Sequence, residues 1–264
     1  MSQQRVAIVI LVVNKPHILT FNLLFRLSVS KYCDRHGYDL HVLTELIEPL
    51  EPFVLKKFYW QRLLIPSLPQ FQQYDFVVSL DADIFISESA PSLPQVSPGK
   101  IGAVNERKYF GNYDWRETIQ KKMGWELTGI EWYRQSGEER SSNDHLQGGL
   151  LIYQPIWHGD LMKRLYSENI SNFMKYYQDD QSFLSIYALD NDCIEWLDQR
   201  FNCVWFFWKE IMYPDFDHYP QHVQIHLVRN FINLNWFTHW TGRYDLNHLE
   251  NVRNLAPTGL THNF

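Results

Sequence analysis

The segment Tyr74-Asp75-Phe76-Val77-Val78-Ser79-Leu80-Asp81-Ala82-Asp83-Ile84-Phe85-Ile86 places two carboxylates one residue apart at the end of an apolar run. The run Phe76–Leu80 predicts a strand that is buried on both faces, as in an α/β protein. Asp81 and Asp83 would then emerge at its C-terminal end, where open α/β sheets bind their ligands. Side chains two residues apart on an extended chain point the same way. Two such carboxylates favour Mn²⁺ or Mg²⁺ that shares its coordination with substrate phosphates.

Two cations upstream of this pair could serve the same site. Lys57 and Arg62 lie on a segment, Lys56–Ile65, that predicts a helix ended by Pro66. The planar guanidinium of Arg62 suits phosphate or carboxylate, and Lys57 can supply a point charge. The alternative is that both cations are solvated helix residues and that an isolated Asp-x-Asp only caps a turn.

The length and charge of the chain limit its class. With 264 residues it can form one large α/β domain or two small ones, and no repeat or linker marks a boundary. We predict a single domain over residues 1–264, with a nucleotide-binding part at about 1–107 and an acceptor-side part at about 108–264. The formal net charge is −6 and no Lys/Arg run forms a basic patch, which argues against a nucleic-acid partner.

The cysteines and the first apolar run bear on the compartment. Cys33, Cys193 and Cys203 are an odd, widely spaced set, which argues against a disulfide framework or a structural zinc site and for a reducing compartment. The run Val6–Val13 is far shorter than the roughly 20 residues that span a bilayer, and no signal-peptide cleavage pattern follows it. We therefore expect a cytoplasmic protein without a transmembrane segment, for which peripheral contact with a membrane stays open.

The N-terminal part of the chain predicts a βαβ unit, which implies a right-handed parallel crossover. Its strands are Val6–Val13 and Tyr38–Leu43, and its helix runs from a Thr20 cap to about Arg35, with Gly37 placed to end it. The side chains expected on the inner side of this helix are Leu23, Leu24, Leu27 and Tyr32.

The rest of the chain alternates predicted strands and helices. A partly helical excursion, Tyr109–Asn143, is expected to cover the active face. The predicted strands are Ile101–Asn105, Gln147–Gln154 and His222–Leu227, and the predicted helices are Ile156–Tyr177 and Asp180–Leu189.

Four motifs, taken in order, resemble those of glycosyltransferases with the GT-A fold. They are the Arg-Leu-x-Ile-Pro helix, the Tyr-Asp-x-Val-Val-x-Leu-Asp-Ala-Asp strand, the Gly-Gly-Leu-Leu-Ile-Tyr strand and the Asp-Asp-Gln-Ser-Phe-Leu helix, within roughly Val6 to Gly242. The likeness is first to the glycogenin and lipopolysaccharide galactosyltransferase type and second to the galactomannan α-galactosyltransferase type. It implies an α/β fold in which a single Rossmann-like mixed sheet is flanked by helices.

The resemblance implies a metal site. In such enzymes the Asp-x-Asp carboxylates hold a Mn²⁺ that bridges the nucleotide diphosphate, a role that would fall to Asp81 and Asp83, with Ala82 beside the nucleotide. The segment His239-Trp240-Thr241-Gly242-Arg243 resembles the one that supplies the third metal ligand, His239 here. His226, at the end of a predicted strand, is the rival ligand.

Further contacts to the donor follow from the same resemblance. Arg243 stands near the position where the family often has a Lys that contacts the diphosphate. Asn14 and Asn105 follow two predicted strands, at the edge where such folds contact the base and the ribose.

The segment Gln147-Gly148-Gly149-Leu150 resembles the family's Asn-x-Gly, with Gln147 where Asn is common. The two glycines would let the sugar approach the backbone, and the alternative is a bulge at the start of a strand.

Asp179-Asp180-Gln181 resembles the Asp-Gln element that lies beside the anomeric carbon in retaining members. Asp180 would bind sugar hydroxyls, and Gln181 would stabilise positive charge that develops at that carbon. In an inverting enzyme, Asp179 or Asp180 would be the general base for the acceptor hydroxyl. The alternative for these acids is capping of the helix.

We therefore expect a metal-dependent glycosyltransferase of polysaccharide biosynthesis that uses a nucleoside diphosphate sugar, UDP-linked, and a saccharide or glycoconjugate acceptor, with retention. Three alternatives stay open: an inverting enzyme of this fold, a catalytically silent protein that binds sugar nucleotides or carbohydrate, and a nucleotidyltransferase. The last should carry a Gly-rich loop after the first strand, where this chain has Asn14-Lys15-Pro16-His17.

Overall fold

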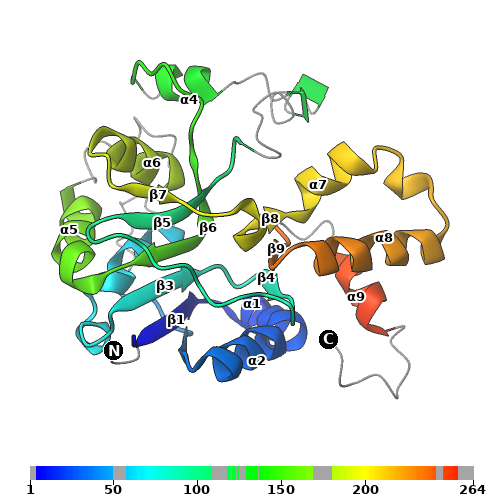
Figure 1. Cartoon of the computed structure of the whole chain (residues 1–264), viewed down its shortest axis with the longest axis horizontal. Coiled ribbons are helices and arrows are strands. Elements are labelled where there is room, and N and C mark those ends of the chain that lie inside the picture. The colour runs from blue at the N-terminus through cyan, green and yellow to red at the C-terminus, as the bar shows by residue number, and fades with distance from the viewer. Residues whose placement is uncertain are drawn as a thin grey trace.

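The computed structural model describes residues 4–49, 58–108, 118, 119, 121, 122, 124, 129–135, 137–168, 180–241 and 246–254. A six-stranded sheet forms its centre, in the order β2-β1-β3-β6-β5-β7 (Figure 1). The strands are β1 (Val6–Leu11), β2 (Asp39–Leu43), β3 (Phe76–Leu80), β5 (Ile101–Asn105), β6 (Leu146–Tyr153) and β7 (Ile194–Trp196). Strand β6 pairs antiparallel with β3 and β5, and the other pairs are parallel, so the predicted mixed sheet is confirmed.

The strand that precedes the two carboxylates lies in the middle of this sheet. Val77, Val78, Ser79 and Leu80 are all buried, because β1 and β6 flank β3 and helices cover the sheet. The prediction of a strand buried on both faces is therefore confirmed. Asp81 directly follows the C-terminal end of β3, at the edge of the sheet.

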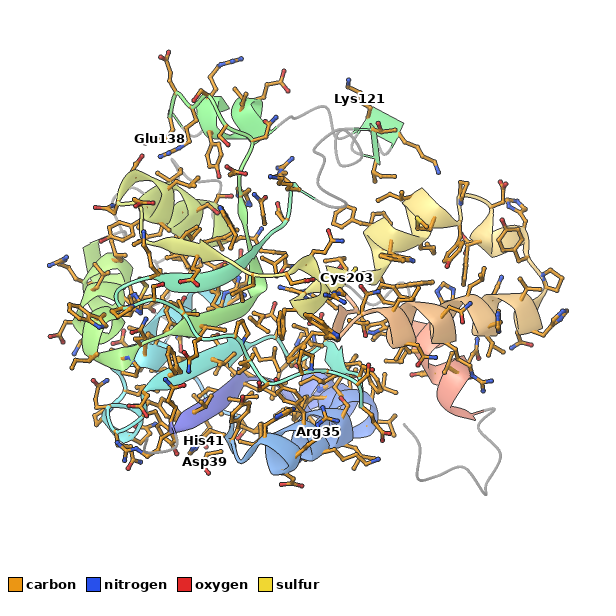
Figure 2. The ribbon with its side chains drawn as sticks, in the orientation of Figure 1. Arg35, Asp39, His41, Lys121, Glu138 and Cys203 are labelled. Atoms are coloured by element: carbon orange, nitrogen blue, oxygen red, sulfur yellow. The ribbon has the colours of Figure 1, made fainter. Side chains whose placement is uncertain are left out.

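A second, three-stranded sheet was not predicted. It has the order β4-β9-β8 and consists of β4 (Ile84–Ile86), β8 (Cys203–Val204) and β9 (Phe237–His239). It joins the large sheet to an arm formed by α7 (Trp205–Met212) and α8 (Gln221–Leu234), and Figure 2 shows Cys203 at this junction. An aromatic cluster fills the base of the arm, where the rings of Trp205 and Trp240 stack at 5.4 Å.

The first crossover helix differs from the prediction at its start. It consists of α1 (Lys15–Thr20), a π-helical turn (Phe21–Phe25) and α2 (Arg26–His36). Asn14 caps it, since its side chain accepts a hydrogen bond from the backbone N–H of His17, and Thr20 lies inside the helix rather than at its cap. The predicted start at Thr20 is too late, because Pro16 lies in the first turn of the helix, where proline is favoured.

The π-helical turn also changes which side chains face the sheet. Leu24 and Tyr32 are buried as predicted, but Leu23 and Leu27 are 65% and 58% exposed. A π-helical turn carries an extra residue, so it rotates the positions that follow and alters the inner face.

The other helices surround the sheet. The segment predicted as an α-helix over Lys56–Ile65 is a 3₁₀-helix, Phe58–Ser67, with Pro66 inside it rather than at its stop. It packs against α5 (Pro155–Glu168), which begins as predicted, and the remainder of the predicted helix to Tyr177 lies outside the described residues. The other labelled α-helices of the described part are α4 (Gly129–Gln135), α6 (Asp180–Asp190) and α9 (Leu246–Asn254).

Two further predictions have outcomes here. The predicted strand His222–Leu227 is wrong, because this segment belongs to helix α8. Its apolar residues alternate locally, but those that are buried recur at helical spacing: Ile225, Val228, Phe231 and Ile232. Nearly half of the excursion Tyr109–Asn143 lies outside the described residues. In the described part of the chain, no helix has the length and apolar character needed to cross a membrane.

Gly37 ends α2 in the left-handed region, with φ of 68°, as the sequence predicted. Replacing Gly37 with Ala should lower the free energy of unfolding by about 1 kcal/mol, because a Cβ disfavours positive φ. Gly37→Asn should cost less, since Asn tolerates this conformation better. Urea denaturation of the three proteins would test this, and equal stability of the Ala and Asn variants would contradict it.

Candidate functional site

The carboxylates of Asp81 and Asp83 lie in the turn between β3 and β4, at the edge of the large sheet. The Asp81 N–H donates to the carbonyl of Gly149 at 2.8 Å, which ties the turn to β6. The Ile84 N–H donates to the carbonyl of Asp81 at 3.3 Å and closes the turn. Both Asp side chains are partly exposed, as the strand-end prediction requires.

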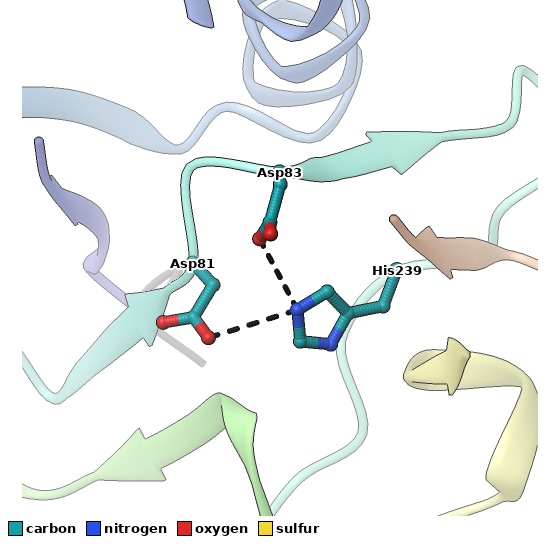
Figure 3. Close-up of side chains that lie close together, drawn as sticks. All are labelled: Asp81, Asp83 and His239. Carbon is teal, nitrogen blue, oxygen red and sulfur yellow. Dashed lines mark ion pairs between the residues drawn. The ribbon is translucent and has the colours of Figure 1, made fainter. Parts of the chain in front are cut away.

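His239 reaches the two carboxylates through the small sheet. Strand β9 pairs antiparallel with β4 so that His239 lies opposite Ile84, and the Trp240 N–H donates to the carbonyl of Asp83 at 2.9 Å. The His239 Nε2 atom is 3.1 Å from Asp83 Oδ1 and 3.7 Å from Asp81 Oδ2 (Figure 3). Among the described residues, this is the one group of three such side chains that could hold a metal ion, with ligand atoms all within 4.8 Å of one another.

The other ring nitrogen of His239 is held by two buried amides. Nδ1 lies 3.0 Å from Asn202 Oδ1 and 3.0 Å from Gln147 Nε2. The Gln147 carbonyl oxygen accepts from the Gly149 N–H at 2.8 Å, which turns the Gln147 amide nitrogen toward the imidazole. In the tautomer whose Nδ1–H donates to Asn202, the Nε2 lone pair faces the carboxylates. Two carboxylates and an imidazole oriented in this way fit Mn²⁺ or Mg²⁺.

The neighbouring charges affect the protonation of His239. Burial opposes a charge on this imidazole, but the carboxylates of Asp83 and Asp81 outweigh burial and raise the pKa of His239 above its ordinary value. With no ion bound, the ring therefore tends to carry the proton that balances the acidic pair.

Arg62 bridges two acids rather than facing solvent. Its side chain is only 12% exposed, and it forms a bidentate pair with Asp180, in which Nη2 is 3.0 Å from Oδ1 and Nε contacts Oδ2. Its Nη1 is 3.1 Å from Asp81 Oδ1 and 2.9 Å from the carbonyl of Gly148. Burial opposes the charge, but Asp180 and Asp81 outweigh it and raise the pKa of Arg62, which stays cationic.

Because Gly148 and Gly149 lack Cβ atoms, side chains of other residues pack directly against their backbone. A Cβ on Gly149 would lie 2.5 Å from His239 Cε1, and a Cβ on Gly148 would lie 2.7 Å from Arg62 Nη2. The resemblance implied that these glycines make room for the sugar. The structure shows that His239 and Arg62 occupy the space beside them.

Gln181 is fixed by a buried network behind Gly148. Its carbonyl oxygen accepts from the Gly148 N–H at 2.7 Å, and its amide nitrogen donates to Glu106 Oε2 at 2.9 Å. The other oxygen of Glu106 is 3.0 Å from His145 Nδ1, and His145 Nε2 is 3.2 Å from the hydroxyl of Ser182. Sequence reasoning missed Glu106, although it directly follows the Asn105 that was selected at the end of β5.

The remaining predicted residues divide into three groups. Asn14 caps α1, and the Asn105 amide donates to Asp144 Oδ1 at 2.5 Å, so both have structural partners. His226 is exposed on α8 and is not part of the metal-ligand group. It lies within a helix, so the predicted strand end that would have brought it to the metal is absent. The predicted residues outside the described part of the chain are Lys57, Asp179 and Arg243.

A cleft of about 810 Å³ opens beside this site. Arg62, Asp81, Ala82, Asp83 and Asp180 form one wall, and the end of β1, helix α1, Trp240 and helix α9 form the rest. Volumes of this order are typical of small-molecule sites with a few convergent polar groups.

No protein-family model matches the chain, and no curated protein matches it. Solved structures do. A glycosyltransferase involved in the glycosylation of the major capsid of PBCV-1 matches with a TM-score of 0.59 and 13% identity, over 95% of this chain and 100% of that one.

Two further structures match over nearly the whole chain. The galactosyltransferase LgtC, solved in complex with donor and acceptor sugar analogs, has a TM-score of 0.57 and 14% identity, over 95% of this chain and 96% of that one. The bifunctional glycosyltransferase WbbM, in its apo structure, has a TM-score of 0.51 and 13% identity, over 96% of this chain and 50% of that one. The chain therefore has the fold of these glycosyltransferases, and the predicted GT-A fold is confirmed.

Proposed function

We propose that this chain is a metal-dependent glycosyltransferase that transfers a sugar from a UDP-linked donor to a saccharide or glycoconjugate acceptor, with retention. The observation that carries the proposal is the convergence of Asp81, Asp83 and His239 at a cleft in a glycosyltransferase fold. The printed name of LgtC adds support, since that protein transfers galactose.

The metal ligands would be Asp81, Asp83 and His239, with Mn²⁺ preferred and Mg²⁺ an alternative. A bound ion would neutralise the diphosphate as it leaves, as a Lewis acid. Asn202 would hold the imidazole of His239 in the orientation that ligation needs, because its Oδ1 accepts from Nδ1–H at 3.0 Å, and Gln147 Nε2 lies 3.0 Å from the same nitrogen. Gln147 would thus act behind the metal site rather than on the sugar.

Arg62, Asp180 and Gln181 would form the sugar end of the site. Arg62 keeps both oxygens of Asp180 engaged and also holds Asp81, so it links the sugar end to the metal end. This engagement leaves Asp180 poorly placed to take a proton from an acceptor hydroxyl, which argues against Asp180 as the base of an inverting enzyme. The carbonyl oxygen of Gln181 accepts from the Gly148 N–H, and this polar oxygen would stabilise positive charge that develops at the anomeric carbon.

The first test is removal of a metal ligand. Asp83→Asn should lower Mn²⁺ affinity, and Mn²⁺-dependent hydrolysis of the UDP-sugar that turns over, by at least about two orders of magnitude, because a charged ligand is lost. A screen of UDP- and GDP-sugars with and without a chelator would first identify that donor. Asp34→Asn, a change at an exposed acid on α2, is the matched control and should leave both quantities unchanged. Hydrolysis that survives both chelation and Asp83→Asn would contradict the metal mechanism, and Mn²⁺ and UDP binding without turnover would indicate the silent alternative.

A second test addresses the amide behind the imidazole. Asn202→Ala removes the acceptor for the Nδ1–H of His239 and should weaken Mn²⁺ binding about 10-fold to 100-fold, less than Asp83→Asn does. Asn202→Asp keeps an acceptor at this position and should retain most of the affinity. Calorimetric Mn²⁺ titrations would measure both, and equal losses in the two variants would count against this role.

A third test uses pH. Only the neutral imidazole can bind a metal, so a proton competes with Mn²⁺ for His239. Because the pKa of His239 is raised, Mn²⁺ affinity should fall as the pH drops through a range that lies above the ordinary His value, and it should level off at higher pH. His239→Asn should bind more weakly and with a flatter pH dependence. Parallel slopes for the two proteins would show that another group governs the titration.

A further inference from the structure

Three leucines form an exposed line on the first crossover helix. Leu19, Leu23 and Leu27, here called the leucine ridge, are 58%, 65% and 58% exposed. They recur every four residues along α1, the π-helical turn and the start of α2, so they share one side of a continuous helix. The opposite side of the helix already supplies the core through Phe21, Leu24, Phe25 and Val29. The ridge is therefore apolar surface that stays exposed outside the hydrophobic core.

The helix that carries the ridge is basic within an acidic chain. Residues 15–36 contain four Lys or Arg and one Asp, whereas the whole chain has a net charge of −6. Lys15 stands four residues before Leu19, and Arg26 directly precedes Leu27; both are exposed. These two cations therefore flank the ridge at its two ends.

The other two cations of the helix have acidic or carbonyl partners. Lys31 pairs with Glu88 at 3.0 Å, and Arg35 donates to the carbonyl of Ala90 at 2.9 Å. Arg26 donates to Asn22 at 3.0 Å, a neutral partner, and no ion pair of Arg26 occurs within the part of the chain that the structure describes. The charge beside the leucines is consequently positive, and this favours an anionic counterpart.

We propose that the leucine ridge docks on an anionic lipid surface, with Leu19, Leu23 and Leu27 in the boundary between headgroups and acyl chains and with Lys15 and Arg26 on lipid phosphates. A helix with an apolar stripe flanked by Lys and Arg is the type that lies in a membrane interface. The size of the patch supports a lipid partner, because a stable protein interface needs roughly 800 Å² per partner, several times what three leucine side chains offer.

Docking there would place the cleft near the lipid. Pro16, His17 and Thr20 of the same helix line the 810 Å³ cleft, and Thr20 is adjacent to Leu19. The lipid contact is proposed on its own evidence. Only its consequence, that glycosyl transfer would occur beside a membrane, rests on the proposed function.

Co-sedimentation with vesicles tests the proposal. The full chain should bind vesicles that mix phosphatidylglycerol with phosphatidylcholine and should bind phosphatidylcholine alone much more weakly. Leu19→Ser/Leu23→Ser/Leu27→Ser should lower the partition coefficient for the anionic vesicles at least about 10-fold, because the inserted apolar surface is lost. Lys15→Glu/Arg26→Glu should lower it by a similar factor, and it leaves the leucines in place.

The control is a second exposed apolar pair at the other edge of the sheet. Ile156 and Trp157 are 86% and 57% exposed and directly follow the end of β6. This end of β6 pairs with the start of β3, whereas α1 follows the end of β1, which runs parallel to β3. The two apolar patches therefore lie at opposite edges of the sheet. Ile156→Ser/Trp157→Ser should bind anionic vesicles as the unmodified chain does. Thermal unfolding of every variant would show that the fold is kept.

Several results would overturn the proposal: no binding of the unmodified chain to anionic vesicles, undiminished binding of the leucine variant, or loss of binding in the Ile156/Trp157 variant instead. Light scattering that shows a dimer which dissociates in the leucine variant would assign the ridge to a second copy of the chain. The donor-hydrolysis assay is independent of these outcomes, so a chain that binds lipid without turnover would refute the proposed function alone.

Discussion

The antiparallel pairing of β4 with β9 is the constraint on which the site depends. Asp81 and Asp83 are fixed locally, since they end β3 in the centre of the large sheet, but His239 lies more than 150 residues further along the chain. The register of Ile84 opposite His239 brings the imidazole to the carboxylates, and the hydrogen bond from Trp240 to Asp83 fixes the approach. The aromatic cluster of Trp205 and Trp240 stabilises β9 from the arm side. A small sheet thus brings together, on a general α/β scaffold, three side chains that could hold a metal ion.

Charge balance is the second requirement. The acids Asp81, Asp83, Asp180 and Glu250 line one cleft, and Arg62 compensates Asp81 and Asp180 from a largely buried position. Loss of one partner of a buried ion pair costs about 3–5 kcal/mol, so Arg62 contributes to stability as well as to the position of Asp180. The glycines beside it are part of the same arrangement, because a Cβ on Gly148 would collide with its guanidinium, just as a Cβ on Gly149 would collide with His239. The π-helical turn, in contrast, affects the outer surface, where Leu23 and Leu27 are exposed.

The sequence predicted the local features well and the long-range ones less well. The buried strand before Asp81, the βαβ start and the Gly37 cap follow from apolar runs and backbone preferences, which act over a few residues, and all are confirmed. The strand predicted at His222–Leu227 is wrong because a short alternation cannot be told from a helix without its packing partners. The contacts of Glu106 and Asn202 were not predicted, because each depends on which side chain lies across a sheet or turn. His239 was selected only through motif resemblance, since its partners are distant in the chain.

The most direct test of this account is the position of the metal in a crystal grown with Mn²⁺ and UDP, located by anomalous scattering at the manganese edge. The account predicts one strong peak within coordination distance of carboxylate oxygens of Asp81 and Asp83 and of His239 Nε2, with Asn202 on Nδ1 of the same ring. A peak held by other residues, or nucleotide bound in the cleft with these three side chains turned away from any ion, would contradict it.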